Sequence, residues 1–310
     1  MRIARLALAV VVLLASCASG PDTAPSDPDA AGAAASEPDP LNGEPPTDDA
    51  AAADPVPVEP EPPADPAPPT DDTPSPASPR PDWLGTVELP LRPDGLGEVG
   101  ETPPELRDRR FAPPDDQPRA DGDAFVADVA PVPDEVAARS TWRPDCPVGL
   151  DELRYVTVTF WGFDERPYVG ELLVHAAAAD DLVEVFRALH EARFPIEEMR
   201  VVGLEELDAP PTGDGNNTTG FVCRSVVSGS SWSQHAYGLA VDINPFHNPY
   251  VRGDRVIPEL ASAYLDRDDH RPGMIQPGDV VTEAFDAIGW GWGGDWRTVS
   301  DWMHFSATGR

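Results

Sequence analysis

The sequence is poor in positive charge. It has 22 Lys and Arg residues against 55 Asp and Glu residues, which gives a formal net charge of −33 at pH 7. Nucleic-acid binding depends on cationic side chains that neutralise phosphates, and so acidic a chain repels them. The composition therefore argues against nucleic acid, and against strongly acidic molecules, as partners.

The apolar run at the start of the sequence is short. The chain begins MRIARLALAVVVLLASC, in which two arginines precede about ten apolar residues. This run is too short for a membrane-spanning helix and has the layout of an export signal. Its last four residues, Leu14 to Cys17, resemble the bacterial lipobox, in which the chain is cut before a cysteine that then carries a diacylglycerol. We predict a lipoprotein signal peptide over residues 1–17 and lipidation of Cys17; a plain secretory cut is the alternative.

The next segment has no Lys, Arg or aromatic residue between Ala18 and Pro79. It consists mainly of Ala, Pro, Asp and Glu, and such a segment cannot bury enough apolar surface to offset the entropy lost on ordering. We predict a disordered tether over residues 18–82. Residues 83–122 contain aromatics but no sustained apolar period, so we predict a poorly structured extension there, followed by a folded domain at 123–310.

Within that domain, helix and strand patterns are mixed without a regular βαβ repeat. Strands are expected at residues 155–163, 170–175 and 238–246, and helices at 176–194 and 280–288. This pattern predicts an α+β fold in which helices flank a small, mostly antiparallel sheet.

Cysteine is scarce, with three residues in the chain. Cys17 belongs to the lipobox, which leaves Cys146 and Cys223. In an exported protein these two are expected to form a disulfide. Two separate buried thiols are the alternative.

Residues 231–246, SWSQHAYGLAVDINPF, place a histidine shortly before a strand. If the strand is extended, Leu239, Val241 and Ile243 lie on one face, and Gly238, Ala240 and Asp242 lie on the other. The first face is expected to pack on the core. The second carries an acid beside two residues with almost no side chain, which leaves space next to Asp242.

His235 and Asp242 are suitable zinc ligands, and a catalytic zinc typically takes three protein ligands and a water. His304, in a glycine- and tryptophan-rich loop near the C-terminus, is the expected third ligand. Asp301, three residues earlier, is expected beside the metal-bound water, although it could be merely a turn former. His247 is an outside candidate ligand, and the other histidines are expected to be structural.

Two further side chains are candidates for holding a substrate. Arg224 could clamp a carboxylate with paired, charge-assisted hydrogen bonds. A surface arginine near a disulfide is the alternative for this residue. Ser233 could contact substrate, or it could simply cap the turn before His235.

Two motifs in this order resemble a known family. Residues 233–242 match Ser-x-His-x-x-Gly-x-Ala-x-Asp, and residues 301–305 match acid-x-x-His-Phe. Both are similar to motifs of the zinc metallopeptidases that include D-alanyl-D-alanine carboxypeptidases and dipeptidases and L-alanyl-D-glutamate endopeptidases, the VanY and VanX relatives. The likeness runs from about Ala138 to the end and is greatest to the endolysin-peptidase branch. The family often has Glu at the position of Asp301, although the endolysin branch also uses Asp, so the subgroup stays open.

The resemblance implies the DD-peptidase or Hedgehog-like zinc peptidase fold and one Zn²⁺ in the catalytic domain. It further implies that His235, Asp242 and His304 bind the zinc, that Asp301 is the catalytic acid and base, and that Arg224 and Ser233 hold the substrate.

These expectations together describe a lipoprotein on the outer face of the bacterial cytoplasmic membrane, facing the cell wall. Its expected activity is hydrolysis of peptidoglycan stem peptides, as a D-alanyl-D-alanine carboxypeptidase or an L-alanyl-D-glutamate endopeptidase. Two alternatives are a non-catalytic, zinc-containing cell-wall-binding lipoprotein and a peptidase that acts on another exported peptide.

Overall fold

A computed structural model describes residues 77–226 and 229–309. The signal peptide expected at residues 1–17, the lipid expected at Cys17 and nearly all of the tether lie outside the described residues. The described residues all belong to one compact unit of the chain, and the description below concerns that unit.

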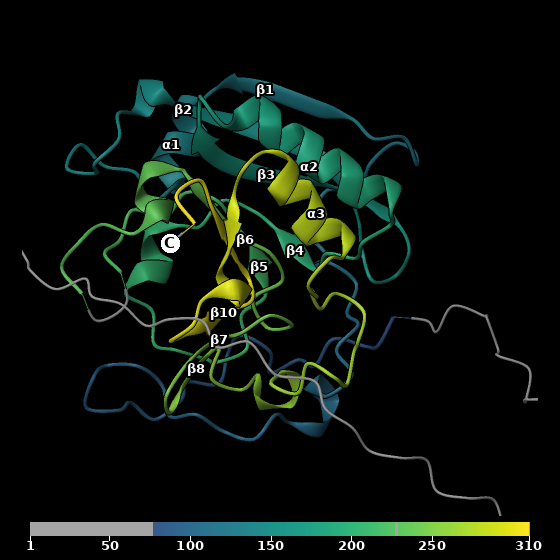
Figure 1. The fold of residues 1–310 in the computed structure, drawn as a ribbon, viewed down its shortest axis with the longest axis vertical. Coiled ribbons are helices and arrows are strands. Elements are labelled where there is room, and N and C mark those ends of the chain that lie inside the picture. The colour runs from purple at the N-terminus through teal and green to yellow at the C-terminus, as the bar shows by residue number, and fades with distance from the viewer. Residues whose placement is uncertain (1–76, 227–228, 310) are drawn as a thin grey trace, which may run out of the picture. The chain divides into compact units, whose positions relative to one another are not determined.

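The largest sheet has three antiparallel strands in the order β1-β2-β3; helix α2 packs against it, and helix α3 lies beside α2 (Figure 1). The bounds are β1 (Ala127–Pro131), β2 (Leu153–Trp161), β3 (Pro167–His175), α2 (Ala179–Glu191) and α3 (Val280–Ala287). β2 is rich in β-branched and aromatic residues, which suit a pleated, half-buried surface. Apolar side chains of β2, β3, α2 and α3 form the main hydrophobic core.

Both predicted helices are confirmed: α2 is three residues shorter than predicted at each end, and α3 begins at the predicted residue and ends one residue earlier. In α2, Leu182, Val185, Phe186 and Leu189 are buried at helical spacing. In α3, the side chain of Asp279 caps the N-terminus by accepting hydrogen bonds from the N–H groups of the first turn.

Three further small sheets are present in the described part of the chain. One has the order β6-β11-β9, the second has the order β10-β7-β8, and the third is a short parallel pair of β4 and β5. The bounds are β4 (Glu198–Met199), β5 (Asn217–Thr218), β6 (Ala240–Asp242), β7 (Tyr250–Arg252), β8 (Arg255–Ile257), β9 (Gly291–Trp292), β10 (Ser300–Asp301) and β11 (His304–Ser306). The predicted α+β class with mostly antiparallel pairing is confirmed.

Short helices occupy the connections. They are η1 (Pro104–Leu106), α1 (Asp134–Arg139), η2 (Leu150–Glu152), η3 (Leu204–Leu207), η4 (Gln234–Tyr237), η5 (Ser262–Tyr264) and η6 (Gly293–Asp295). Of these, η4 and η6 position functional side chains, as described below.

The expectation for residues 83–122 needs correction. The segment has little regular structure, but it is firmly packed: Leu106 and Phe111 are fully buried in a second core with Phe246. Arg109 is also buried, because Glu197 accepts two hydrogen bonds from its guanidinium, at 2.7 and 2.8 Å. The packed structure therefore begins well before Asp123. Apolar periodicity in the sequence could not reveal this packing, because a charged residue such as Arg109 adds nothing to an apolar pattern even when an acid pairs with it and it is buried.

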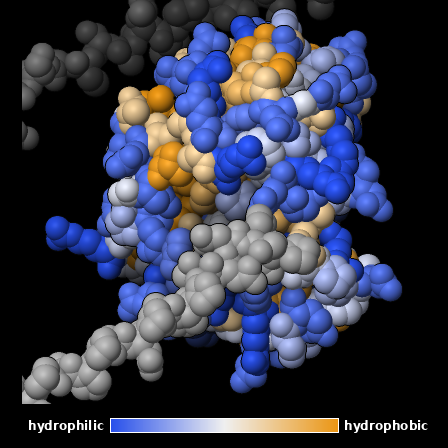
Figure 2. Space-filling view, turned by 90° about the vertical axis from the view of Figure 1, so that its right-hand side faces the viewer, coloured by the Kyte–Doolittle hydropathy of each residue, from blue (hydrophilic) through white to orange (hydrophobic). Residues whose placement is uncertain are grey.

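The surface of this unit reflects the polar composition. On the face drawn in Figure 2, hydrophilic residues predominate and hydrophobic residues form separate patches. Among residues 77–226 and 229–309, no helix is both long and apolar enough to cross a lipid bilayer.

Candidate metal centre

His235 lies on η4, a short helical turn. Two residues of the first motif, Ser233 and Gly238, set its start and its end. The Ser233 hydroxyl accepts a hydrogen bond from the backbone N–H of His235 at 3.3 Å and so caps the turn. Gly238 ends the turn at a φ of +67°, and a Cβ there would lie 2.6 Å from the backbone nitrogen of His175. Only glycine fits this position, which accounts for the glycine of the first motif.

Asp242 and His304 occupy directly opposite positions on antiparallel strands β6 and β11. The backbone N–H and C=O of Asp242 bond to Thr219 on the other side, at 2.9 and 3.0 Å. Asp242 and His304 are therefore a pair without mutual backbone hydrogen bonds, the kind in which facing side chains lie closest. The alternation predicted for β6 holds, since Val241 and Ile243 are fully buried in the main core.

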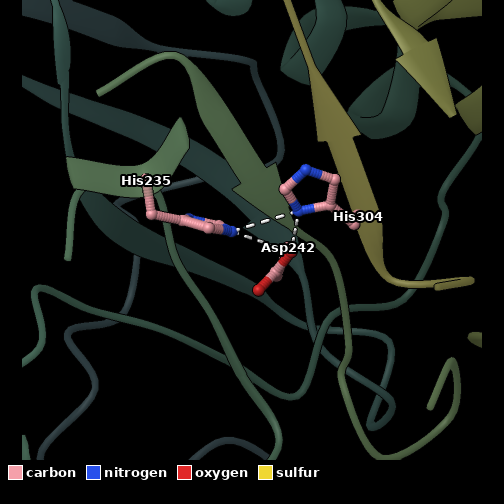
Figure 3. A group of neighbouring side chains, drawn as sticks. All are labelled: His235, Asp242 and His304. Atoms are coloured by element: carbon pink, nitrogen blue, oxygen red, sulfur yellow. Dashed lines mark hydrogen bonds and ion pairs between the residues drawn. The ribbon is translucent and has the colours of Figure 1, made fainter. Parts of the chain in front are cut away.

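The side chains of His235, Asp242 and His304 point toward one another (Figure 3). His235 Nε2 lies 3.1 Å from Asp242 Oδ1 and 3.2 Å from His304 Nδ1. His304 Nδ1 lies 3.0 Å from Asp242 Oδ1. Three potential ligand atoms thus form a nearly equilateral triangle.

The chemistry of these atoms fits a bound cation. The carbonyl of Gly220 lies 2.6 Å from His235 Nδ1, so Nδ1 carries a proton, and in the neutral form of the ring Nε2 presents a lone pair. That lone pair faces a carboxylate oxygen, an arrangement that requires a proton or a metal ion between them. Three ligands of a tetrahedral zinc lie about 3.3 Å apart, given bond lengths of about 2.0 to 2.1 Å. The triangle is close to that size, and two imidazoles with one carboxylate are a donor set that suits zinc.

The charge state of Asp242 also suits a ligand. Burial by itself raises the pKa of this carboxyl, but the neighbouring His235 and His304 outweigh that effect and hold the pKa below its ordinary value. Asp242 is therefore ionised at neutral pH and brings a full negative charge to the site.

Asp301 lies on β10 and lines the same pocket as the three donor residues. Its Oδ1 atom is buried and has no hydrogen-bond partner among the described residues. Burial raises the pKa of Asp301 to about 7; the charge of Asp242 adds to this rise, and His304 and Arg224 oppose it. A carboxyl group with a pKa near neutrality can both accept and donate a proton at physiological pH.

The glycine- and tryptophan-rich loop holds Asp301 in place. A Cβ on Gly293 of η6 would lie 2.5 Å from the carbonyl oxygen of Asp301, so the loop backbone packs directly on this residue. Trp292 Nε1 donates to the Trp302 carbonyl at 2.9 Å, and the Trp296 ring lies 5.5 Å from the His304 ring.

The predicted disulfide is present between Cys146 and Cys223, whose Cα atoms are 5.9 Å apart. The N–H of Cys223 also donates to the hydroxyl of Thr141 at 2.9 Å. Arg224 follows directly, lines the pocket and has an Nη1 that donates to the Ser225 carbonyl at 3.2 Å. The disulfide therefore fixes the backbone from which Arg224 reaches the pocket.

The pocket has a volume of about 540 Å³. Besides the predicted site residues, its lining includes Trp232, Tyr250, Arg252, Ile257 and Trp296. Sequence reasoning missed the contribution of Tyr250, Arg252 and Ile257. Gly253 and Asp254 separate two short runs of strand-forming residues, a pattern typical of a β-hairpin. This pattern could have indicated a second structural element close to β6.

His247, the outside candidate ligand, does not join the group. It is fully buried, its Nε2 donates to the carbonyl of Arg109 at 2.9 Å, and its Nδ1 lies 3.1 Å from the amide nitrogen of Asn216. Both ring nitrogens are thus used within the protein. His247 helps to join the extension to the domain.

Residues 227–307 match a protein-family model described as D-alanyl-D-alanine carboxypeptidase. The match supports a peptidase. The matched segment covers less than a third of the chain but contains all three donor residues, Ser233 and Asp301, while Arg224 lies just before it. No curated protein and no solved structure matches the chain. The likeness to the endolysin branch stays a prediction.

Proposed function

We propose that this protein is an exported, lipid-anchored zinc peptidase that hydrolyses peptidoglycan stem peptides. The observation that carries the proposal is the convergence of His235 Nε2, Asp242 Oδ1 and His304 Nδ1 within 3.0 to 3.2 Å of one another in a pocket that Asp301 also lines. The family match, described as D-alanyl-D-alanine carboxypeptidase, supports both the reaction class and the substrate class.

His235, Asp242 and His304 would hold one zinc ion. When bound, zinc polarises a peptide carbonyl and lowers the pKa of a water molecule toward about 7. Gly220 and Ser233 contribute indirectly, because the Gly220 carbonyl fixes the orientation of the His235 ring and the Ser233 hydroxyl fixes the turn that carries it.

Asp301 is the residue that moves protons. As the oxygen of the attacking water bonds to the carbonyl carbon, the Asp301 carboxylate accepts the water proton. When the peptide C–N bond breaks, Asp301 delivers that proton to the leaving nitrogen. Asp301 has a pKa near 7 and a carboxyl oxygen without a hydrogen-bond partner in the part of the chain that the structure describes, and both properties suit these two steps.

Arg224 is proposed to bind a carboxylate of the substrate. Its guanidinium forms no ion pair among the described residues. It lines the pocket near Asp301, and its charge opposes the rise in the pKa of that carboxyl group. A free carboxylate occurs at the C-terminus of a stem peptide and on its D-glutamyl unit, so this interaction is compatible with a carboxypeptidase and with an endopeptidase. Trp232 and Trp296 supply apolar wall next to it.

The predicted tether fits work in the cell wall. A flexible chain of about sixty residues has a root-mean-square length of about 5 to 6 Å times the square root of the residue number, which amounts to several nanometres. A domain anchored through Cys17 could therefore reach stem peptides some distance from the membrane.

Mass spectrometry of a defined pentapeptide stem and of a muropeptide digest tests the proposal. Both are incubated with zinc-loaded protein that lacks only the first 17 residues, with Asp301→Asn as the matched variant. Loss of one D-alanine identifies a carboxypeptidase, and release at the L-alanyl-D-glutamyl bond identifies an endopeptidase. We expect Asp301→Asn to retain zinc and to lose about 10²- to 10⁴-fold in turnover.

No cleavage by protein that carries one zinc would contradict the proposal and would favour the non-catalytic wall-binding alternative. Cleavage of unrelated peptides with a free carboxylate, but of no stem peptide, would indicate a peptidase with another exported substrate.

A further inference from the structure

The β7–β8 hairpin forms one wall of the pocket. Tyr250 is paired with Asp301 on one side and with Ile257 on the other, so these three side chains form one row across a face of the sheet. All three line the pocket. Arg252 lies two residues beyond Tyr250, on the same face, and also lines the pocket. The hairpin thus presents one arginine to the space in which the proposed substrate lies.

Arg252 is directly opposite Arg255, at the end of the hairpin. Like charges at facing positions of an antiparallel pair destabilise it. Arg255 is compensated, since its Nη2 lies 3.1 Å from Asp94 Oδ2. Arg252 has no ion-pair partner within residues 77–226 and 229–309 and is exposed. The unfavourable pair of arginines therefore leaves one cation available to an anion from outside.

Neighbouring acids cannot compensate Arg252 without giving up other partners. Asp254 accepts a hydrogen bond from Arg92 Nη2 at 2.8 Å, and Asp94 is engaged with Arg255. The extension thereby holds the hairpin from its outer end and occupies the nearby carboxylates. In a chain with a net charge of −33, this keeps a positive side chain at the mouth of the pocket.

The pocket consequently offers two cations at different places. Arg224 comes from the segment after the disulfide and influences Asp301, whereas Arg252 comes from the β7–β8 hairpin. One guanidinium suffices to bind one carboxylate. A second guanidinium on another wall of the same pocket fits a substrate with a second anionic group.

We propose that Arg252 is a specificity-determining residue that binds a second carboxylate of the substrate. The preferred substrate is then a peptide with two free carboxylates, one held by Arg224 near the bond that is cut and one held by Arg252 along the chain. This inference rests on the proposed function, because it assigns the substrate of the same pocket.

A binding assay tests the inference without turnover. Zinc-loaded Asp301→Asn protein is titrated with two synthetic stem pentapeptides that differ at one side chain, which ends in a carboxylate in the first and in its primary amide in the second. Trp232 and Trp296 line the pocket, so their fluorescence reports binding. We expect the carboxylate peptide to bind about tenfold more tightly than the amide, because only the carboxylate forms charge-assisted hydrogen bonds with the guanidinium.

Three variants in that background locate the effect. Arg252→Gln should bind the carboxylate peptide as weakly as the amide peptide. Arg255→Lys is the matched control on the facing strand; it keeps a cation for Asp94, so it should keep the preference. Arg224→Gln should weaken both peptides by a similar factor, since both keep the carboxylate that Arg224 is proposed to hold.

A preference that survives in Arg252→Gln, an absence of preference in the unaltered pocket, or an absence of binding by both peptides would each overturn the inference. The outcome is separable from that of the proposed function. Cleavage of stem peptides without a carboxylate preference refutes the role of Arg252 alone. A preference that depends on Arg252, without cleavage by protein that retains Asp301, supports that role and refutes the peptidase.

Discussion

Asp242 and His304 face each other across β6 and β11, and Asp242 Oδ1 lies 3.0 Å from His304 Nδ1. Backbone pairing with Thr219 and β11 fixes the strand that carries Asp242, so two of the three donors are placed by the sheet itself. The third donor, His235, is held by the Gly220 carbonyl. The donors are therefore organised by the fold, and a metal ion has little rearrangement to impose on them.

The first prediction concerns metal binding. His304→Ala leaves two donors and should lose the stoichiometric zinc, with a fall in affinity of at least about 100-fold. The measurement is zinc content by elemental analysis after dialysis, together with a zinc titration of the stripped protein.

His270→Ala is the control, because His270 is exposed and lies outside the donor group. This variant should keep one zinc per chain. Retention of one tightly bound zinc by His304→Ala would show that the metal, if bound, lies elsewhere.

Much of this site could be predicted from the sequence because its residues follow local rules. Alternation along residues 238–243 placed Asp242 opposite the core face, and small neighbours indicated free space beside it. The glycine of the turn and the serine cap also have local causes. His304 is remote in the sequence; it was expected in the site because it lies three residues after Asp301 in a glycine- and tryptophan-rich loop, and the resemblance of the two motifs implied the same role.

The parts that sequence reasoning missed depend on contacts between distant segments. Arg109 is buried because Glu197, far along the chain, neutralises it, and no local pattern records such a partner. The strands β7, β8 and β10 have two or three residues each, too few for a clear period. β7 and β8 lie beside the pocket because β7 pairs with β10, the strand that carries Asp301.

The second prediction concerns the attachment of residues 83–122. Glu197 is fully buried and accepts hydrogen bonds from Arg80, Arg109 and Asn216. Glu197→Gln leaves the buried guanidinium of Arg109 without a counter-charge. We expect a loss of about 3 to 5 kcal/mol in the free energy of unfolding, measured by urea denaturation.

Glu184→Gln is the matched control for Glu197→Gln. Glu184 is paired with Arg187 one turn later on α2, with both side chains largely exposed. Its replacement should change stability by less than about 0.5 kcal/mol. Equal stability of the two variants would mean that the extension is not anchored by the buried pair.

The third prediction concerns the disulfide. The bridge closes a loop of 77 residues, and its loss through Cys146→Ser with Cys223→Ser should lower the free energy of unfolding by about 2 to 5 kcal/mol. Oxidised protein alkylated without reductant should show no modification of these two cysteines by intact-mass analysis. Labelling of both thiols would contradict a structural bridge.

The fourth prediction concerns stability in acid. Burial lowers the pKa of His247 to about 4, from 6.5 for an ordinary histidine; Glu197 and the Arg109 carbonyl oppose this fall, and the charges of Arg109 and Arg267 add to it. Between pH 6.5 and pH 4, His247 therefore binds a proton more readily in the unfolded chain than in the folded one. Stability contributed by neutral His247 is present above pH 6.5 and is lost as the pH falls toward 4. Between pH 7 and pH 5 the loss is about 2 kcal/mol.

Between pH 7 and pH 5, Asp301 has the opposite effect on the stability of the fold. Because its pKa is raised to about 7, the folded, metal-free protein takes up a proton there before the unfolded chain does, and acidification favours the fold. The two effects are separated by a comparison of Asp301→Asn with the double variant Asp301→Asn, His247→Gln, both stripped of metal. Urea denaturation at pH 7 and pH 5 should show the loss in the single variant and about 2 kcal/mol less of it in the double variant. Equal pH dependence in the two proteins would mean that His247 is not held neutral between the extension and the domain.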